Sequence, residues 1–315
     1  MRRLLRLVAL TLAVGITGLV VVIFVLAPGP RPPLAPAGDV GALLAEIDWQ
    51  PNPPIDDPVE RGRQVFIAGG CAACHTAENG EGLAGGRPLE TPFGTFYGPN
   101  ITPDAEHGIG GWTEAEFDRA LREGIAPDGS LYYPAFPFTS YTGMTDTDVA
   151  DLWAYLQTVP PSAEPNLEHD LALPYRWRFP IQVWRWLYFE PGGPEISGEQ
   201  PEAWLRGAYL VEVLGHCGQC HTDRTLLGGL DHDSAFSGTS SGPDGRPVPD
   251  ITPAGLDGWS LSDITFFLNI GMLPDGNFVG GDMAEVVSEN TSQLTTSDRQ
   301  AMAVYLMMLP TIDGQ

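Results

Sequence analysis

The chain has 315 residues, which is enough for two domains of ordinary size with a hydrophobic core each. It carries 40 Asp and Glu against 16 basic residues, all of them Arg, and its formal net charge is −24. A surface this acidic repels nucleic acid and anionic lipid, and it favours either a basic protein partner or solubility alone. The 38 Gly and 30 Pro indicate long loops and short helices rather than a continuous bundle.

The N-terminal segment has the pattern of a membrane anchor. Residues 1–6 include three Arg, and residues 7–27 carry no charge. A helix over 7–27 would be about 31 Å long, enough to cross a bilayer core. A cleavable signal peptide is the alternative, but its apolar core is usually shorter, and Pro28 follows the nearest small residue. We therefore expect residues 1–27 to form a transmembrane helix in the inner membrane, with a cytoplasmic N-terminus and the remaining domains in the periplasm.

Prolines cluster directly after this segment, at positions 28, 30, 32, 33 and 36. Such spacing favours a semi-rigid extended chain. We expect residues 28–54 to be a Pro-rich linker that holds the first domain away from the membrane.

The rest of the chain, with expected domains at residues 55–160 and 198–315, is a duplication, because residues 61–160 and 206–310 repeat one another in order. The matching segments are Arg61-Gly62 and Arg206-Gly207, Asn100-Ile-Thr-Pro103 and Asp250-Ile-Thr-Pro253, Gly111-Trp112-Thr113 and Gly258-Trp259-Ser260, and Pro127-Asp128-Gly129 and Pro274-Asp275-Gly276. Each copy has about 100 residues, too many for a solenoid repeat. The sequence therefore predicts two similar domains joined by residues 161–197.

Each copy carries the same helix signals. A hydroxyl residue suited to an N-cap is followed by an acidic residue in the first turn, where the helix dipole favours it. The pairs are Thr113 with Glu116 and Thr145 with Asp148 in the first copy, and Ser260 with Asp263 in the second, where Thr295 or Thr296 starts a last helix that ends before Pro310. With one helix before each Cys pair, we expect three helices per copy, with loops between them and no strands.

The connector, residues 161–197, is rich in Pro and aromatic residues. The aromatic residues are Tyr175, Trp177, Phe179, Trp184, Trp186, Tyr188 and Phe189. They suit an interfacial or partner-docking surface, and equally a connector that fills the gap between two domains.

The four cysteines fall in two pairs of the same spacing, and each pair is followed by His. The motifs are Cys71-Ala-Ala-Cys74-His75 and Cys217-Gly-Gln-Cys220-His221. Two Cys three positions apart can attach to the two vinyl groups of one porphyrin, and the adjacent His is then held under the iron. This pentapeptide is the signature of c-type haem attachment. We expect two covalent haem c groups with His75 and His221 as proximal iron ligands.

Three other interpretations of the Cys pairs fit less well. A redox dithiol needs no following His and is expected in a βαβ context. A zinc site would need four ligands in each domain, and no second cluster lies at zinc spacing. A disulfide within each pair would close only a two-residue loop, which constrains little.

The sixth ligand separates a carrier from a catalyst, because an iron with six protein ligands does not easily bind substrate. Met is the usual partner of His in high-potential cytochromes. Met144 is the only Met between the two motifs, just ahead of the last helix of the first copy. In the second copy we favour Met283, in a Gly-rich loop, over the other four Met. Those are Met272, Met302, Met307 and Met308, and His107, His169, His216 and His232 remain as possible substitutes.

Two further pairs of residues are candidates for contacts around the haem. The carbonyls of Pro99 and Pro249 could accept the N–H of the proximal His and fix its tautomer. The indole N–H groups of Trp112 and Trp259 could donate to a haem propionate, although simple packing is the alternative for each.

On these motifs both copies resemble class I cytochrome c domains. Residues 55–315 resemble the diheme c-type cytochromes related to the cytochrome c subunit of membrane-bound alcohol and aldehyde dehydrogenases. The resemblance also rests on residues 98–103, 131–137, 140–144 and 290–292. It implies an all-α fold around each haem, and an electron relay from a dehydrogenase to a terminal acceptor. Those subunits typically carry three haems where this chain has two motifs, and some have Met at Phe136.

We therefore expect an electron carrier of the respiratory chain rather than an enzyme. Its partners would be redox proteins, namely a dehydrogenase donor and a cytochrome or oxidase acceptor, with the membrane contacted through the N-terminal helix and no nucleic acid. The alternative is a diheme enzyme such as a peroxidase or thiosulfate dehydrogenase with one open haem, and a gas sensor is a weaker third possibility.

Overall fold

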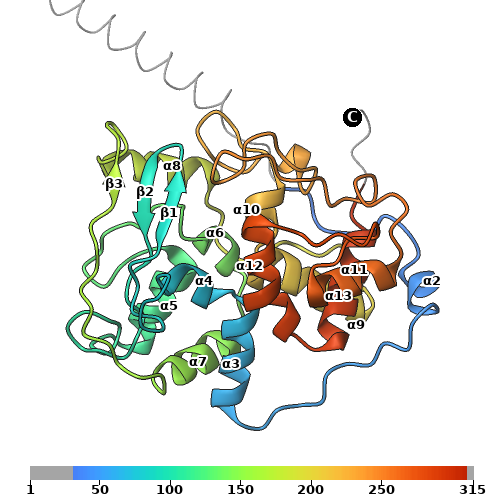
Figure 1. The fold of residues 1–315 in the computed structure, drawn as a ribbon, viewed down its shortest axis with the longest axis horizontal. Coiled ribbons are helices and arrows are strands. Elements are labelled where there is room, and N and C mark those ends of the chain that lie inside the picture. Colours follow the sequence, from blue (N-terminus) through green and yellow to red (C-terminus); the bar gives the residue numbers. More distant parts are fainter. Residues whose placement is uncertain (1–30, 311–315) are drawn as a thin grey trace, which may run out of the picture.

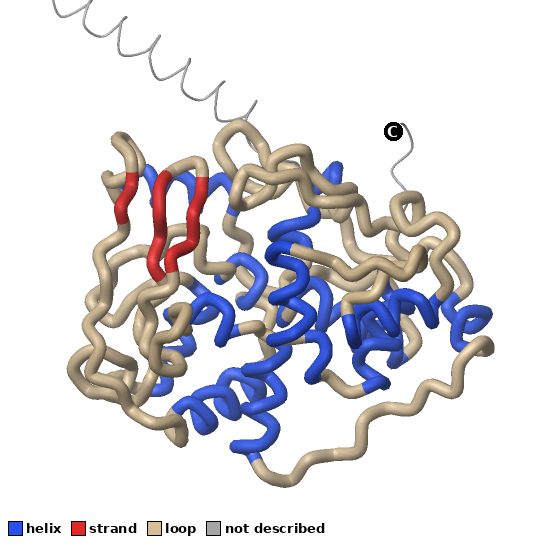
Figure 2. Tube along the Cα trace, in the orientation of Figure 1, coloured by secondary structure: helices blue, strands red, loops and turns tan. Residues whose placement is uncertain are grey.

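The computed structural model describes residues 31–310 (Figure 1). The first copy holds α3 (Pro58–Ala68), α4 (Cys71–His75), α5 (Glu114–Glu123), α6 (Phe138–Tyr141) and α7 (Asp146–Leu156). The second holds α9 (Glu202–Ala208), the π-helix η1 (Tyr209–Leu214), α10 (Gly218–His221), α11 (Leu261–Ile270), α12 (Gly281–Glu289) and α13 (Thr296–Met307), with short 3-10 helices η2 (His232–Ser234) and η3 (Thr291–Gln293). Long loops connect these helices, as the Gly and Pro content predicts (Figure 2).

In each copy the first and last helices cross at a glycine. A Cβ on Gly62 would lie 1.9 Å from the carbonyl oxygen of Asp151 on α7, and a Cβ on Gly207 would lie 2.0 Å from that of Ala301 on α13. In each copy, the Arg that precedes the Gly forms an ion pair with the helix that the Gly contacts. Arg61 Nε lies 2.6 Å from Asp151 Oδ2, and Arg206 Nε lies 2.8 Å from Asp298 Oδ1. The repeated Arg-Gly pair is therefore the crossing point of two helices.

The duplicated first helix differs between the copies by one residue. Nine positions separate Gly62 from Cys71, and ten separate Gly207 from Cys217. The second copy accommodates the extra residue in η1, where Gly215 N donates to Leu210 O in the i→i+5 pattern of a π-helix.

The predicted helix starts are confirmed. Thr113 with Glu116 and Ser260 with Asp263 form complete capping boxes on α5 and α11. Thr145 caps α7 by accepting from Asp148 N. Thr295, rather than Thr296, caps α13 in the same way.

The expectation of an all-α fold is wrong in one respect. Strands β1 (Pro88–Thr91), β2 (Gly94–Tyr97) and β3 (Asp170–Leu171) form a small antiparallel sheet in the order β1-β2-β3. It occupies one corner of the molecule (Figure 2). The strands have four residues or fewer, too few to display an alternating pattern, and β3 pairs with β2 from the distant connector. Neither the short strands nor their pairing with a distant segment can be predicted from the local sequence.

The expected transmembrane helix must also be corrected. Residues 1–27 lie outside the part of the chain that the structure describes, and within residues 31–310 no helix combines the length and apolar character needed to cross a bilayer. The structure thus gives no support for an N-terminal transmembrane helix or for single-pass anchoring in the inner membrane, and neither is carried further.

The described part of the Pro-rich linker lies along the second copy rather than standing free (Figure 1). Leu34 exchanges backbone hydrogen bonds with residues 195–197, and the short helix α2 (Val40–Leu44) buries Val40 in the core. Trp49 Nε1 donates to Ser297 O over 3.0 Å. These contacts carry the chain around the second domain before the first domain begins.

The connector contains α8 (Phe179–Tyr188), which packs one face against the first copy. Phe138, with no exposed surface, contacts the rings of Trp184 and Phe189. The other face is open, with Phe179 72% and Trp186 76% exposed. Thr225 of the second copy donates to the Tyr188 hydroxyl over 2.9 Å, so the connector contacts both copies and leaves the other face of α8 exposed.

Candidate haem-binding sites

Each Cys-x-x-Cys-His motif forms a short helix, α4 or α10, that ends at the His. His75 Nδ1 lies 2.7 Å from the carbonyl oxygen of Pro99, and His221 Nδ1 lies 2.8 Å from that of Pro249. Because a carbonyl can only accept, Nδ1 carries the proton in both rings, and the lone pair of Nε2 stays free for a metal. Burial lowers the pKa of both His, which keeps the rings neutral. Each ring therefore has the tautomer and the neutral charge that an iron ligand requires.

The segment that presents each Pro carbonyl is held in the same way in the two copies. Gly85 N donates to His75 O and Gly238 N donates to His221 O, both over 2.8 Å. A Cβ on either glycine would lie 2.6–2.7 Å from the carbonyl carbon of the Pro that bonds the His. Only glycine therefore allows the backbone to approach this closely.

The residue after each motif His supports the same segment. The hydroxyl of Thr76 accepts from Leu83 N over 3.1 Å, and that of Thr222 accepts from Phe236 N over 3.0 Å. Sequence reasoning missed these threonines and the two glycines beside the Pro carbonyls. The signal was available for the threonines, because each motif reads Cys-x-x-Cys-His-Thr, whereas the two glycines lie at different distances from their motifs.

The thiols do not have the environment of a redox dithiol or a zinc site. Burial, followed by the neighbouring thiol, raises the pKa of Cys71 and of Cys217 to about 12, so both remain protonated at neutral pH. All four Cys are free rather than disulfide-bonded. Within residues 31–310 no group of three His, Cys, Asp or Glu side chains could hold a metal ion. A neutral His beside two thiols, without further ligands, instead suits a metal that brings its own equatorial donors, as haem does.

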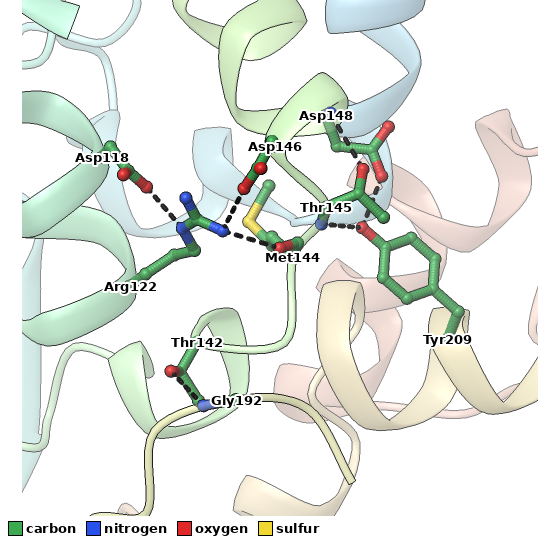
Figure 3. Close-up of polar contacts among 9 residues, drawn as sticks. All are labelled: Asp118, Arg122, Thr142, Met144, Thr145, Asp146, Asp148, Gly192 and Tyr209. Carbon is green, nitrogen blue, oxygen red and sulfur yellow. Dashed lines mark hydrogen bonds and ion pairs between the residues drawn. The ribbon is translucent and has the colours of Figure 1, made fainter. Parts of the chain in front are cut away.

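Met144 lies in a buried loop between α6 and α7, with 4% of its surface exposed. Arg122 Nη1 donates to Met144 O over 3.3 Å and pairs with Asp146 over 2.7 Å (Figure 3). The loop is thus held at its backbone while the thioether points into the core. A buried, uncharged sulfur fits the sixth position of a low-spin haem.

Met283 lies on a helix, not in the loop that the sequence suggests. It is the third residue of α12, one turn past Gly280, and it is half-buried. Burial raises the pKa of the Cys220 thiol, and the negative charge of nearby Asp282 adds to the rise. Glu285 on the same helix likewise adds to the raised pKa of Cys74 in the first motif, so α12 lies near thiols of both motifs. Its role as iron ligand stays a prediction.

The remaining candidates from the sequence include Trp112, Trp259, His169 and His216. Trp112 and Trp259 are half-buried and pack against the hydrophobic core, and their contact with a haem propionate stays a prediction. His169 instead accepts from Tyr97 N beside the sheet. His216 contacts the ring of Tyr141 at 5.5 Å, at the boundary between the copies.

The two motifs approach one another across that boundary. Tyr141 of the first copy donates to Gly69 O over 2.8 Å, beside Cys71, and its ring meets His216, beside Cys217. Burial and the charge of Glu285 raise the pKa of the Cys74 thiol against the lowering effect of Arg87, and the Cys220 thiol is close enough to add to the rise. Groups attached at the two motifs would thus lie near each other, which favours transfer of electrons between them.

Comparison with known proteins agrees with this geometry. The family model for cytochrome c matches residues 59–160. A diheme cytochrome c-type protein of Cereibacter sphaeroides is 47% identical over 282 residues, which cover 84% of this chain and 93% of that protein. The cytochrome c subunit of a quinone alcohol dehydrogenase from Gluconacetobacter polyoxogenes is 39% identical and that of a gluconate 2-dehydrogenase from Pantoea cypripedii 38% identical. The matches cover 86% and 87% of this chain but only 60% and 64% of those subunits.

Proposed function

Because the chain belongs to the diheme c-type cytochromes, we propose that it carries electrons from a dehydrogenase to a downstream acceptor, with His75 and Met144 binding one haem iron and His221 and Met283 the other. Electron transfer through haem c follows from the family; the donor and the ligand assignment are the proposal. The Arg-rich start followed by apolar residues suits an exported chain, so we place this activity in the periplasm.

The observation that carries the proposal is the repeated bond from the His Nδ1 to a Pro carbonyl. It fixes the tautomer and orients the ring, so that little reorganisation is needed when the charge at the metal changes. Bound haem c would supply a one-electron Fe(III)/Fe(II) couple at each site. The buried thioether of Met144 favours the ferrous state and excludes water from that position.

A dehydrogenase donor is supported by the relatives, two of which are cytochrome subunits of dehydrogenases. The acidic surface, with a net charge of −24, suits a partner that presents basic residues around its own redox site. Such steering predicts that the rate of electron transfer falls with rising salt.

Absorption spectroscopy of the oxidised protein tests the ligand assignment. We expect the weak long-wavelength Met–Fe(III) band with an intensity for two haems, loss of about half of it in Met144→Leu, and no carbon monoxide binding by the reduced wild type. A band for one haem, together with carbon monoxide binding, would instead support the diheme enzyme.

The donor is tested separately. The oxidised protein is mixed with the catalytic subunit of a quinone-dependent alcohol dehydrogenase and ethanol, and haem reduction is followed by stopped flow at increasing salt. Reduction that slows with salt supports the proposal. Absence of reduction would exclude this class of donor without affecting the ligand assignment.

A further inference from the structure

The segment that carries Met144 is held from the second domain. Tyr209, on η1, donates from its hydroxyl to the carboxylate of Asp148, and the same oxygen accepts from Thr145 N over 3.2 Å (Figure 3). Thr145 follows Met144 directly and caps α7. The connector adds a bond from Gly192 N to the hydroxyl of Thr142 over 2.9 Å. The Met144 loop is thus fixed on both sides by residues outside its own domain.

The helix that carries Met283 is held from the first domain. Arg87 Nη2 lies 2.7 Å from Glu285 Oε2, with each side chain about one third exposed. Asn290, at the end of α12, donates from Nδ2 to Ala68 O over 3.0 Å in a buried contact. Because Ala68 ends α3 just before the first haem motif, α12 is attached to the domain opposite its own at two points.

The bond between Tyr209 and Asp148 has no counterpart across the duplication. The position of Tyr209 corresponds to Gln64 in the first copy, which bonds Glu60 within its own helix. Asp148 corresponds to Asp298, which pairs with Arg206 within the second copy. The hydroxyl that holds the Met144 segment comes from the π-helix, which among the described residues only the second copy has. π-Helical turns are frequent at functional sites.

We propose that each domain positions the sixth iron ligand of the other, Tyr209 acting as the positioning residue for Met144 and Arg87 for Met283. The inference rests on the proposed ligand assignment. It makes ligand binding at either haem depend on the contact between the domains. Separation of the domains would release both Met, and a docked state would hold both haems closed.

The test uses imidazole, which competes with Met for the sixth position, in the full-length holoprotein. The methyl resonances of the two Met ligands, shifted upfield in the NMR spectrum of the reduced protein, report each haem separately once assigned with Met144→Leu and Met283→Leu. Imidazole titration of the oxidised protein, compared with these two variants that each keep both haems and one Met ligand, gives an affinity for each site. Absence of two upfield methyl signals in the wild type would overturn the ligand assignment itself.

Given that assignment, Tyr209→Phe should raise imidazole affinity about fivefold at the first haem and leave the second unchanged. Arg87→Gln should raise it about threefold at the second haem and leave the first unchanged. Asp148→Asn, which weakens the Tyr209 contact from the other side, should reproduce the first effect. The double variant Arg87→Glu with Glu285→Arg exchanges the two charges and should restore the wild-type imidazole affinity at the second haem.

Two variants serve as matched controls. Tyr155→Phe removes a Tyr hydroxyl from the first domain, and Arg63→Gln breaks an ion pair of 2.8 Å within α3. Neither should change either affinity. The proposal is overturned if Tyr209→Phe and Arg87→Gln act on the same haem, if they act on the haem of their own domain, or if they match the controls.

Discussion

The helix crossing at Gly62 offers the sharpest test of the fold that supports the first haem site. In Gly62→Ala the new Cβ would lie 1.9 Å from Asp151 O and 2.8 Å from Tyr155 Cβ. Backbone cannot move aside as a flexible side chain can, so α3 and α7 must separate. Overpacking of this kind costs about 3 kcal/mol, of which helix propensity returns about 1 kcal/mol because Ala is the better helix former. We expect a net loss of about 2 kcal/mol.

Urea and thermal unfolding, followed by far-ultraviolet circular dichroism, measure this loss. For a domain of about 100 residues, 2 kcal/mol lowers Tm by about 8–16 °C. Gly82→Ala is the matched control, since a Cβ there would meet nothing within 4 Å. Gly207→Ala should destabilise the second domain to a similar extent, because its Cβ would lie 2.0 Å from Ala301 O. The reasoning is refuted if Gly62→Ala is as stable as Gly82→Ala.

Three further predictions concern separate parts of the molecule. Cys71→Ala with Cys74→Ala should lower the covalent haem content from two to one per chain in a pyridine haemochrome assay; retention of both would exclude the first motif as an attachment site. Phe138→Ala should cost about 3–5 kcal/mol in urea unfolding because the ring is fully buried, whereas Trp186→Ser, at a side chain 76% exposed, should change stability by less than about 0.5 kcal/mol. Burial lowers the pKa of His216 to about 4, so the unfolded chain binds a proton that the folded chain does not. Protonation of His216 in the unfolded chain should therefore lower the free energy of unfolding, by no more than about 3 kcal/mol, as the pH falls from about 6.5 to 4. In His216→Phe this part of the pH dependence of the urea midpoint should disappear, and an unchanged slope would contradict the assigned shift.

The features that the sequence predicts well are those encoded within a few residues. The cap of α5 needs only Thr113 and Glu116, and the haem motif needs only its five positions. The duplication adds a second instance of each, which makes coincidence improbable. The contact between the His ring and the Pro carbonyl, 24 positions apart in the first copy, could be anticipated because both ends recur in the second.

The features that sequence reasoning misses depend on residues far apart in the chain. β3 exists because Leu171 of the connector pairs with Gly94, and neither four-residue strand is stable alone. Met283 was expected in a loop because Gly280 and Gly281 precede it, yet Gly281 begins α12, which is held by Arg87 from the other domain. The prolines of the linker predict only a semi-rigid extended chain, while Val40 and Trp49 bind it to the second domain. In each case tertiary contacts override a local preference.

This division between local and distant contacts also explains which parts of the duplicated domains remain alike. The His side of each site, from the motif to the Pro carbonyl, is closed by hydrogen bonds within about 30 residues, so either copy retains it independently of its neighbour. The segments that carry Met144 and Met283 lie at the boundary between the domains, where each contacts residues of the other copy. The extra residue in η1 and the displacement of the second Met onto α12 both fall at this boundary. The two sites therefore share the contact between His and the Pro carbonyl but differ in the segments that carry Met144 and Met283, because each of those segments is held by residues of the other domain.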